Sequence, residues 1–421
     1  MRLLNFRLLD GTGRDDARAS LTIGDDGRIA NVTRGAGPPA EPGDLDLSGH
    51  TVLPGLFDCH VHLVADASTN PFDTSRGPAS AHFGILGAVN ARRLLRRGIT
   101  TARDLGAHHF TDLAIKRAIE SGLIPGPRLL TSGKILTMTG GHGWLFGQEV
   151  DGVDEVRKYA RLNLKMGADN IKMVASGGVL TPGVNPRAAS LSEEELAAGF
   201  AEAAKAGKLS AAHAQSNAGI KNAIRAGVRT IEHGFWLDEE ACQMMIDRDV
   251  YLSPTLAAMR CMLERTAELP AFIVDKVSRF ADDHFASFAL AQRLGVKIVC
   301  GTDAGTPFNY HGEVVVELLQ MTELGMSPMD ALVAATQRSA EALRLDGVTG
   351  TVAAGKAADL LVVKGDPLQD LRILREPAFV FKEGWQVSPE KLDLEVPKQK
   401  LRASDLWGAA EKFLAQGCAC C

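Results

Sequence analysis

The order of hydrophobic and polar positions divides the chain into distinct parts. Residues 1–54 contain short alternating apolar runs separated by turns rich in Asp and Gly, which is typical of short strands joined by hairpins. From residue 55 onward, apolar runs of strand length alternate with helical patterns, which indicates βα units and a parallel sheet. Short strand patterns return at residues 358–363 and 377–382.

The middle of the chain contains eight strand candidates. They are residues 53–59, 99–104, 127–132, 170–175, 209–213, 229–233, 250–255 and 297–302. Helix boundaries are also visible, since Ser192 to Glu195 form a capping box and Gly167 and Gly295 end helices just before the fourth and eighth strands. Eight βα units over roughly 290 residues predict a (β/α)8, or TIM, barrel. A doubly wound open sheet is the alternative, but it would need a glycine-rich phosphate loop after its first strand, and residues 58–62 contain none.

We therefore expect an α/β protein with three parts. The expected parts are a small composite β-sandwich domain formed from both chain ends (residues 1–54 plus 346–400), a (β/α)8 barrel catalytic domain (55–345), and a C-terminal helix and tail (401–421).

The composition describes a globular protein and narrows its partners. Hydrophobic residues make up 45% and charged residues 23% of the 421 positions, and the net charge of −5 argues against nucleic acid or an anionic membrane as a partner. The chain shows no apolar run of transmembrane length and no leader pattern, so we expect a cytoplasmic protein. The seven cysteines are not spaced as a disulfide framework, and three of them crowd the C-terminal tip.

Candidate chemistry begins with two histidines at the end of the first central strand. His60 and His62 are two residues apart, so in a strand both side chains point to the same face. Neutral histidine is the commonest metal ligand in proteins. The alternative is a pair of core histidines that happen to have this spacing, and the pair alone does not decide between the two interpretations.

Further polar residues fall at the ends of other predicted strands, where the catalytic residues of a barrel lie. Strands four, five, six and eight carry Lys172, His213, His233 and Asp303 in these positions. Each has an ordinary alternative, such as a capped histidine or an N-capping aspartate, but a buried lysine must be neutral, paired or chemically modified. Because none of these residues falls in the middle of a helix, their joint pattern favours one shared metal-binding site.

Together these residues resemble the pattern of the amidohydrolase superfamily, with the order His-x-His, Lys, His, His, Asp. The flanking sequence is similar to the imidazolonepropionase-like and prolidase-like branch over essentially residues 1–385. The similar stretches are Val52 to His62, Gly98 to Gly106, Ile231 to Gly234 and Gly355 to Leu360. Within that branch the chain looks most like the ochratoxin-A-hydrolysing amidohydrolases, which cut an amide between an aromatic acyl group and phenylalanine.

This resemblance implies a site with two divalent metal ions, usually zinc. The implied ligands are His60, His62 and Asp303 for one ion, His213 and His233 for the other, and Lys172, as a carbamate formed with CO2, for the bridge. The modification is physically reasonable, because burial lowers the pKa of a lysine and two dications stabilise the resulting anion. Asp303 would also act as general base and then as general acid.

The resemblance further implies substrate contacts. His142, in a glycine-rich loop after the third strand, would hydrogen-bond the carbonyl or carboxylate of the substrate, and its alternative is a loop histidine that faces solvent. The loop of Ser176, Gly177 and Gly178 has backbone donors that could meet a substrate carboxylate.

Several other polar and aromatic residues receive structural expectations. We expect Arg103-Asp104 to be an ion pair below the site, and His284 to be a surface or packing histidine of a helix. No role is assigned to His50, His82, His108, His109 and His311. Aromatic residues near strand ends make an aromatic substrate plausible; these are Trp144, Phe146, Phe235, Trp236 and Tyr310.

The expected function is metal-dependent hydrolysis of the amide bond of an N-acyl, especially aryl-acyl, amino acid such as ochratoxin A. An Xaa-Pro or Xaa-Arg dipeptidase of the same superfamily is the alternative. A deaminase would place a glutamate a few residues beyond His213, where residues 214–217 contain none. A phosphotriesterase-like hydrolase is disfavoured because such enzymes usually lack the two-ended β-domain. Imidazolonepropionase activity is disfavoured because that enzyme uses one metal without the bridging lysine. A non-catalytic metal-binding protein is the alternative of another class. Relatives also imply a homo-oligomer, for which an octamer is one candidate.

Overall fold

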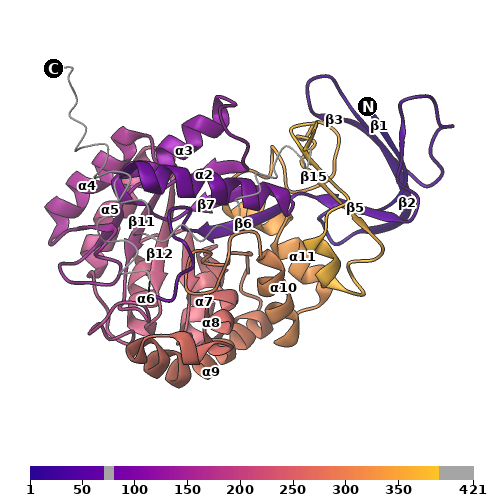
Figure 1. Cartoon of the computed structure of the whole chain (residues 1–421). Coiled ribbons are helices and arrows are strands. Elements are labelled where there is room, and N and C mark those ends of the chain that lie inside the picture. Colours follow the sequence, from indigo (N-terminus) through magenta and orange to yellow (C-terminus); the bar gives the residue numbers. More distant parts are fainter. Residues whose placement is uncertain (71–79, 388–421) are drawn as a thin grey trace, which may run out of the picture. The chain divides into compact units, whose positions relative to one another are not determined.

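The computed structural model describes residues 1–70 and 80–387. The predicted C-terminal helix and tail (401–421), with its three cysteines, and residues 388–400 of the expected β-domain lie outside the described residues. The described part is an α/β structure, in which one sheet is built from both ends of the chain and a set of parallel strands alternates with helices (Figure 1).

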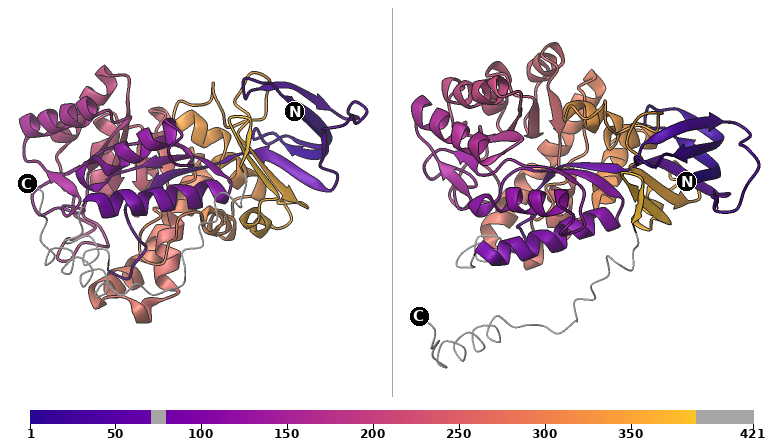
Figure 2. Two further views of the ribbon diagram at one scale, coloured as in Figure 1. Left: turned by 45° about the horizontal axis from the view of Figure 1, so that its top comes forward. Right: turned by 90° about the horizontal axis from the view of Figure 1, so that it is seen from above.

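One sheet joins the two ends of the described chain. Its strands are β1 (Arg2–Leu9), β2 (Asp15–Ile23), β3 (Ile29–Arg34), β4 (Leu45–Asp46), β5 (His50–Pro54), β15 (Leu360–Lys364), β16 (Phe379–Lys382) and β17 (Trp385–Val387). They pair in the order β17-β16-β15-β5-β1-β2-β3, with β4 beside β1. The ends meet where β15 runs antiparallel to β5, with Val362 opposite Val52. Figures 1 and 2 show the N-terminal strands in indigo beside the C-terminal strands in yellow.

The core of this sheet follows from strand periodicity. Phe6 and Leu8 of β1, and Leu360 and Val362 of β15, are pairs of residues two apart, and all four are buried in one cluster. The sheet thus combines strands from both ends of the described chain. The bounds of the expected domain and its division into two packed layers stay predictions.

The central strands run parallel and alternate with helices. They are β6 (Leu56–Val61), β7 (Ile99–Asp104), β8 (Arg128–Leu130), β9 (Ile135–Thr137), β10 (Gly147–Glu149), β11 (Asn170–Val174), β12 (Leu209–Ala214), β13 (Thr230–His233) and β14 (Tyr251–Ser253). Ladders join β6-β7-β8 and β10-β9-β11-β12-β13-β14. A hydrogen bond of 3.1 Å from the Asn170 N–H to the Thr131 carbonyl connects β11 to the residue just after β8.

Two of the eight predicted strands differ from expectation. The first begins at Leu56, because Leu53 belongs to β5 and pairs with Leu361 across the chain-end sheet. Residues 297–302 form no regular strand, although the segment lies where the eighth strand is expected. Its Val299 N–H donates to the Leu252 carbonyl of β14, and its Cys300 carbonyl accepts from Cys59 of β6. The eighth segment thus contacts both the seventh strand and the first, but with isolated hydrogen bonds.

Helices follow most of these strands. They are α2 (Ser80–Arg96), α3 (Thr111–Glu120), α4 (Val153–Met166), α5 (Glu193–Lys205), α6 (Asn217–Arg225), α7 (Glu239–Asp247), α8 (Leu256–Leu263), α9 (Ala271–Leu294), α10 (Val314–Glu323), α11 (Pro328–Ala334) and α12 (Gln337–Ala342). Ser192 and Glu195 form the predicted capping box of α5, and Gly167 and Gly295 end α4 and α9 in the left-handed conformation. Among the described residues, no helix has both the length and the apolar character needed to cross a bilayer.

Gly55 lies between β5 and β6, at a position with no room for a side chain. A Cβ atom there would lie 2.1 Å from Oγ1 and 2.4 Å from Cγ2 of Thr100, which is buried on β7 and restricted by its β-branch. We expect Gly55→Ala to lower the free energy of unfolding by about 1–3 kcal/mol through overpacking, measured by urea denaturation. Gly347→Ala is the matched control, since a Cβ atom there meets nothing within 4 Å. Equal stability of the two variants would contradict this account.

Candidate active site

The predicted ligand residues meet at the carboxyl ends of the parallel strands. Strand register brings three of them together, because Val174, two residues after Lys172, lies opposite His213, and Ala214 lies opposite His233. One cavity is lined by all six predicted ligands and by His142; these residues are His60, His62, His142, Lys172, His213, His233 and Asp303.

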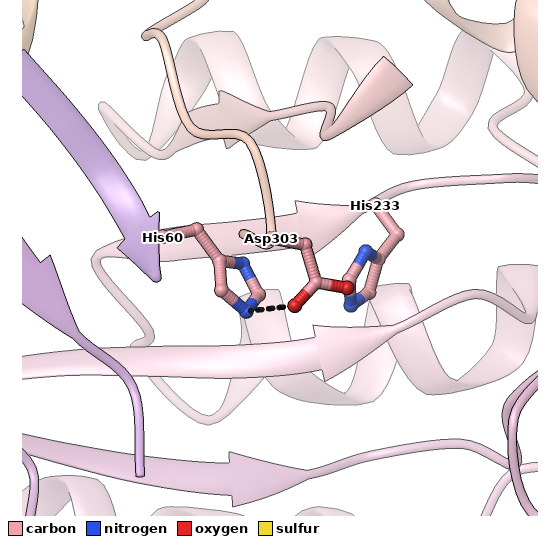
Figure 3. A group of neighbouring side chains, drawn as sticks. All are labelled: His60, His233 and Asp303. Atoms are coloured by element: carbon pink, nitrogen blue, oxygen red, sulfur yellow. Dashed lines mark ion pairs between the residues drawn. The ribbon is translucent and has the colours of Figure 1, made fainter. Parts of the chain in front are cut away.

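His60, His233 and Asp303 form a compact group within this cavity. One potential ligand atom from each residue lies within 4.8 Å of the other two, and Figure 3 shows the three side chains side by side, with the carboxylate between the two rings. Asp303 Oδ1 is 3.4 Å from Nε2 of His60 and 3.4 Å from Nε2 of His62. Imidazole and carboxylate together are a donor set that binds divalent metal ions such as zinc.

Three of the imidazoles are oriented by a hydrogen bond from Nδ1. The bonds are His60 to Glu232 (3.0 Å), His62 to the Gly106 carbonyl (3.0 Å) and His233 to Thr255 Oγ1 (2.7 Å). Burial lowers the pKa of all three rings, that of His62 to about 4, so the rings are neutral. A neutral imidazole that donates from Nδ1 keeps a lone pair on Nε2. These rings therefore have the tautomer that a metal site requires.

His213 is oriented through its other nitrogen. Its Nε2 donates to the Gly177 carbonyl at 2.9 Å, which leaves Nδ1 without a proton, and burial lowers the pKa of the ring to about 3. The ring centre lies 4.6 Å from that of His233 and 4.3 Å from that of His142. All four predicted imidazole ligands thus keep one unprotonated nitrogen.

A buried ion pair lies behind His60, and it is not the predicted one. Arg103 pairs with Glu232 at 2.9 Å and donates from Nε to the Cys59 carbonyl, while Asp104 accepts the N–H groups of Leu63 and Gly106. The prediction of an Arg103-Asp104 pair is wrong because adjacent residues in a strand point to opposite faces. Sequence reasoning gave Glu232 no role; its signal was a carboxylate inside a short apolar strand beside a candidate ligand.

Lys172 and Asp303 are the two buried charged groups of the cavity whose pKa values shift toward the neutral form. Lys172 is 2% exposed, and no hydrogen bond or ion pair joins its Nζ to another described residue. Burial lowers the pKa of Lys172 to about 8, against the attraction of Glu232 and Asp303. Burial raises the pKa of Asp303 to about 7, against the attraction of Lys172. An amine with a lowered pKa is more often unprotonated, and hence more often nucleophilic.

His142 is held by the loop that follows β11. Thr181 Oγ1 accepts the N–H of Gly143 and lies 2.8 Å from His142 Nδ1, so the hydroxyl is placed to donate to that nitrogen. The proton of the ring then lies on Nε2, the atom left for a substrate. Lys276 of α9 holds this loop by donating to three carbonyls, those of Gly178, Thr181 and Val184.

The predicted substrate-binding loop has internal contacts of its own. Ser176 Oγ donates to the Gly177 carbonyl, and the Gly177 N–H donates to the Ala188 carbonyl, so this donor already has a partner. A Cβ atom on Gly178 would lie 2.4 Å from the His142 ring, so glycine permits the close packing of loop and ring. A role of Ser176, Gly177 and Gly178 in binding a carboxylate stays a prediction.

His284, expected to be a surface or packing histidine, and His311, which received no predicted role, lie next to predicted ligands. His284 is no surface residue: it is 1% exposed, stacks on Phe235 at 4.0 Å and donates from Nε2 to the Pro254 carbonyl. His311 Nε2 donates to the carbonyl of His62 at 3.0 Å. Their sequence neighbourhoods carry no pattern that would have revealed these contacts.

The backbone at the site is strained. His233, Thr255 and Asp303 have φ angles of 75°, 54° and 59°, in the left-handed region that residues other than glycine rarely adopt. Such conformations cluster at functional sites, where the surrounding structure compensates their cost.

Two chambers adjoin the central cavity. The first, which we call the His108 chamber, is lined mainly by His62, Val64, His108, Phe146, Leu180 and Thr306. The second, which we call the His284 chamber, is lined by Leu180, Gln215, Phe235, Met259, Met262 and His284, and it shares His142, His213, His233 and Asp303 with the central cavity. Apart from Asp303, no Asp, Glu, Lys or Arg lines either chamber in the described part of the chain.

Comparison with known proteins gives a consistent result. Residues 51–388 match the model of the Amidohydrolase family. The chain is 31% identical to an ochratoxinase of Aspergillus niger over 405 residues, which cover 89% of this chain and 83% of that protein.

Solved structures of similar fold include both hydrolase types considered above. A Xaa-Pro dipeptidase with bound methionine in its active site is 32% identical, with a TM-score of 0.86, over 92% of this chain and 99% of the other. The A. niger ochratoxinase structure is 29% identical, with a TM-score of 0.83, over 92% of this chain and 96% of the other.

The contact between Glu232 and His60 predicts an effect on metal affinity. The carboxylate of Glu232 orients His60 and balances the charge of Arg103, and Glu232→Gln removes this negative charge. We therefore expect the affinity for zinc to fall about 10–100-fold, measured by competition with a chelator. The control is Glu120→Gln, which alters a mainly exposed carboxylate paired with Lys116 at 3.7 Å. Zinc affinity of Glu232→Gln equal to that of the control would show that Glu232 does not orient the ligand.

Proposed function

The chain belongs to the amidohydrolase family, and from this premise we propose that it hydrolyses the amide bond of N-acyl amino acids, with an aryl-acyl amide such as ochratoxin A as the leading substrate class. Membership of the family makes it a hydrolytic enzyme. The observation that carries the proposed substrate is the pair of chambers beside the proposed metal-binding residues, whose described lining is apolar or neutral apart from Asp303. A substrate with an apolar group on each side of the cleaved bond fits this arrangement.

We also infer that the central strands close into a (β/α)8 barrel. Supporting this inference, parallel strands follow one another in chain order, and the eighth segment hydrogen-bonds to β14 and to β6. The composite β-domain would then comprise residues 1–54 plus 346–400, and the barrel residues 55–345.

The proposed site holds two divalent ions, most suitably zinc. The proposed ligands are His60, His62 and Asp303 for one ion, His213 and His233 for the other, and a carbamate of Lys172 between them. The unprotonated nitrogen on each imidazole and the buried, unpaired amine of Lys172 fit such a centre. When bound, the ions would supply Lewis acidity and lower the pKa of the attacking water.

The residues of the chain would move the protons and position the substrate. Asp303 would accept a proton from the water on its carboxylate and donate it to the leaving nitrogen, which leaves poorly unless it is protonated. Its Oδ1 lies 3.4 Å from Nε2 of His60 and of His62, which places the carboxylate within the proposed ligand set. His142 would donate from Nε2 to the substrate carbonyl or carboxylate, with Thr181 fixing its tautomer.

A dipeptidase of the Xaa-Pro or Xaa-Arg type is the second candidate. The similarity to a Xaa-Pro dipeptidase structure favours it, whereas the absence of charged side chains other than Asp303 from the described chamber linings disfavours an arginine side chain. From the resemblance to the amidohydrolase superfamily, we also propose that the protein is a homo-oligomer. We propose that it acts on a small amide and has no nucleic-acid or membrane partner.

The zinc-loaded protein should hydrolyse N-benzoyl-L-phenylalanine with a higher kcat/KM than Xaa-Pro or Xaa-Arg dipeptides, measured by release of the free amino acid. Asp303→Asn should lower kcat about 10²–10⁴-fold, since proton transfer contributes this much to catalysis. Asp330→Asn, at the start of α11 where the carboxylate meets Ser327, is the control and should keep full activity. Faster turnover of dipeptides would favour the second candidate.

The carbamate of Lys172 predicts a spectroscopic signature. After incubation with ¹³C-bicarbonate and zinc, the protein should show a carbamate carbon signal in its NMR spectrum, and Lys172→Ala should lack it. The same variant should bind less than two zinc ions per chain, measured by metal analysis. Lys208→Ala, which removes a lysine paired with Asp169 away from the cavity, should keep both properties. Two tightly bound ions in Lys172→Ala would exclude Lys172 as the bridge.

A further inference from the structure

The His284 chamber contains a polar side chain that the proposed chemistry does not use. Gln215 lines this chamber and is 4% exposed. Its backbone N–H donates to Ser176 Oγ at 2.8 Å. Its side-chain Oε1, however, has no hydrogen-bond partner among the described residues, and its Nε2 donates to none of them. An unpaired buried amide lowers stability, so its presence in a substrate chamber needs an explanation.

The position of Gln215 follows from the strand that carries His213. Gln215 directly follows β12, two residues after His213 at the carboxyl end of that strand. Both residues line the His284 chamber. Gln215 is thus placed to contact a group attached to the reacting bond while remaining separate from the metal ligands.

His284 is another buried polar side chain of the same chamber. His284 Nε2 donates to the Pro254 carbonyl at 2.8 Å, so the proton lies on Nε2 and Nδ1 carries a lone pair. This Nδ1 is buried and makes no hydrogen bond of normal geometry with a described residue, although the His233 carbonyl also acts on the ring and opposes the lowering of its pKa by burial. Phe235, stacked on the ring at 4.0 Å, fixes the plane of the imidazole.

The remaining lining determines what charge the chamber accepts. Leu180, Phe235, Met259 and Met262 are apolar, and the only charged side chain of the described lining is Asp303, which belongs to the proposed ligand set. A charged substituent would lose its hydration here without gaining an opposite charge. A neutral group with one hydrogen-bonding function would gain both the apolar contacts and the partner that the amide lacks.

We propose that Gln215 determines specificity by binding a hydroxyl group carried on the apolar part of the substrate in the His284 chamber. A hydroxyl both donates and accepts, so it matches the amide in either orientation of its oxygen and nitrogen. This inference rests on the proposed function, because it states which N-acyl amino acids that site prefers: those whose part in the His284 chamber is an uncharged aryl group with a ring hydroxyl.

Gln215→Met tests this role, because methionine has nearly the shape of glutamine without its polar end. An amide with no protein partner should be replaced without loss, so the melting temperature of the variant should equal or exceed that of the parent. Gln243→Met is the matched control, since Gln243 is exposed on α7 and its Nε2 donates to Asp247 Oδ1.

Binding is measured by calorimetry with zinc-loaded protein in an Asp303→Asn background, in which hydrolysis should be about 10²–10⁴-fold slower. The probes are N-benzoyl-L-phenylalanine, its ortho-, meta- and para-hydroxybenzoyl analogues, and N-benzoyl-L-tyrosine. We expect at least one hydroxylated probe to bind about 10-fold tighter than N-benzoyl-L-phenylalanine, because a site built around a hydroxyl discriminates against its absence. Gln215→Met should abolish this preference and leave the affinity for the parent probe within about threefold, whereas Gln243→Met should keep it.

Three results would overturn the inference. The first is equal affinity for hydroxylated and parent probes, which includes no binding of any probe. The second is a preference for a hydroxylated probe that survives in Gln215→Met. The third is a melting temperature of Gln215→Met several degrees below that of Gln243→Met, which would assign Gln215 a structural role. Turnover is measured separately with Asp303 intact. If that protein cleaves none of the probes, the proposed function fails, while the affinities still decide the role of Gln215.

Discussion

The buried ion pair between Arg103 and Glu232 is the interaction on which the site depends. Both side chains are fully buried, so each loses its hydration, and their close pairing offsets part of that large cost. Glu232 meets Arg103 with one oxygen and His60 with the other, and Arg103 also donates to the Cys59 carbonyl. Residues of β6, β7 and β13 are thereby connected under the cavity. The direction of a metal-binding ring is thus fixed by a charge on another strand.

The sequence predicts most of the site because its signals are local. Two histidines two residues apart share a face in any strand, and Lys172, His213 and His233 follow from the ends of apolar runs. Parallel strands then bring those ends together, so a position along the chain becomes a position in the cavity. The boundaries of β7 and the capping box of α5 depend on short-range patterns too, and both agree with expectation.

What the sequence does not predict is the identity of distant partners. Arg103 stands beside Asp104 in the chain but pairs with Glu232, 129 residues later. His284 lies on a long helix whose pattern gives no reason to place it beside Phe235, and His311 reaches the carbonyl of a residue 249 positions earlier. The eighth segment also escapes exact prediction, because its hydrogen bonds alternate between two neighbours and form no continuous ladder. Such contacts depend on packing between elements far apart in sequence.

The seam between β5 and β15 has a consequence for how the chain acquires its structure. Leu53 of β5 pairs with Leu361 of β15, so during synthesis the amino-terminal strands leave the ribosome long before their partner strand has been made. Until then the edge of β5 presents unsatisfied backbone groups, which are a template for aberrant association. Completion of this sheet is therefore a late, non-local event, and contacts of this kind fold slowly. The pairing of β5 with β15 can therefore form only after the central region of the chain has been synthesised.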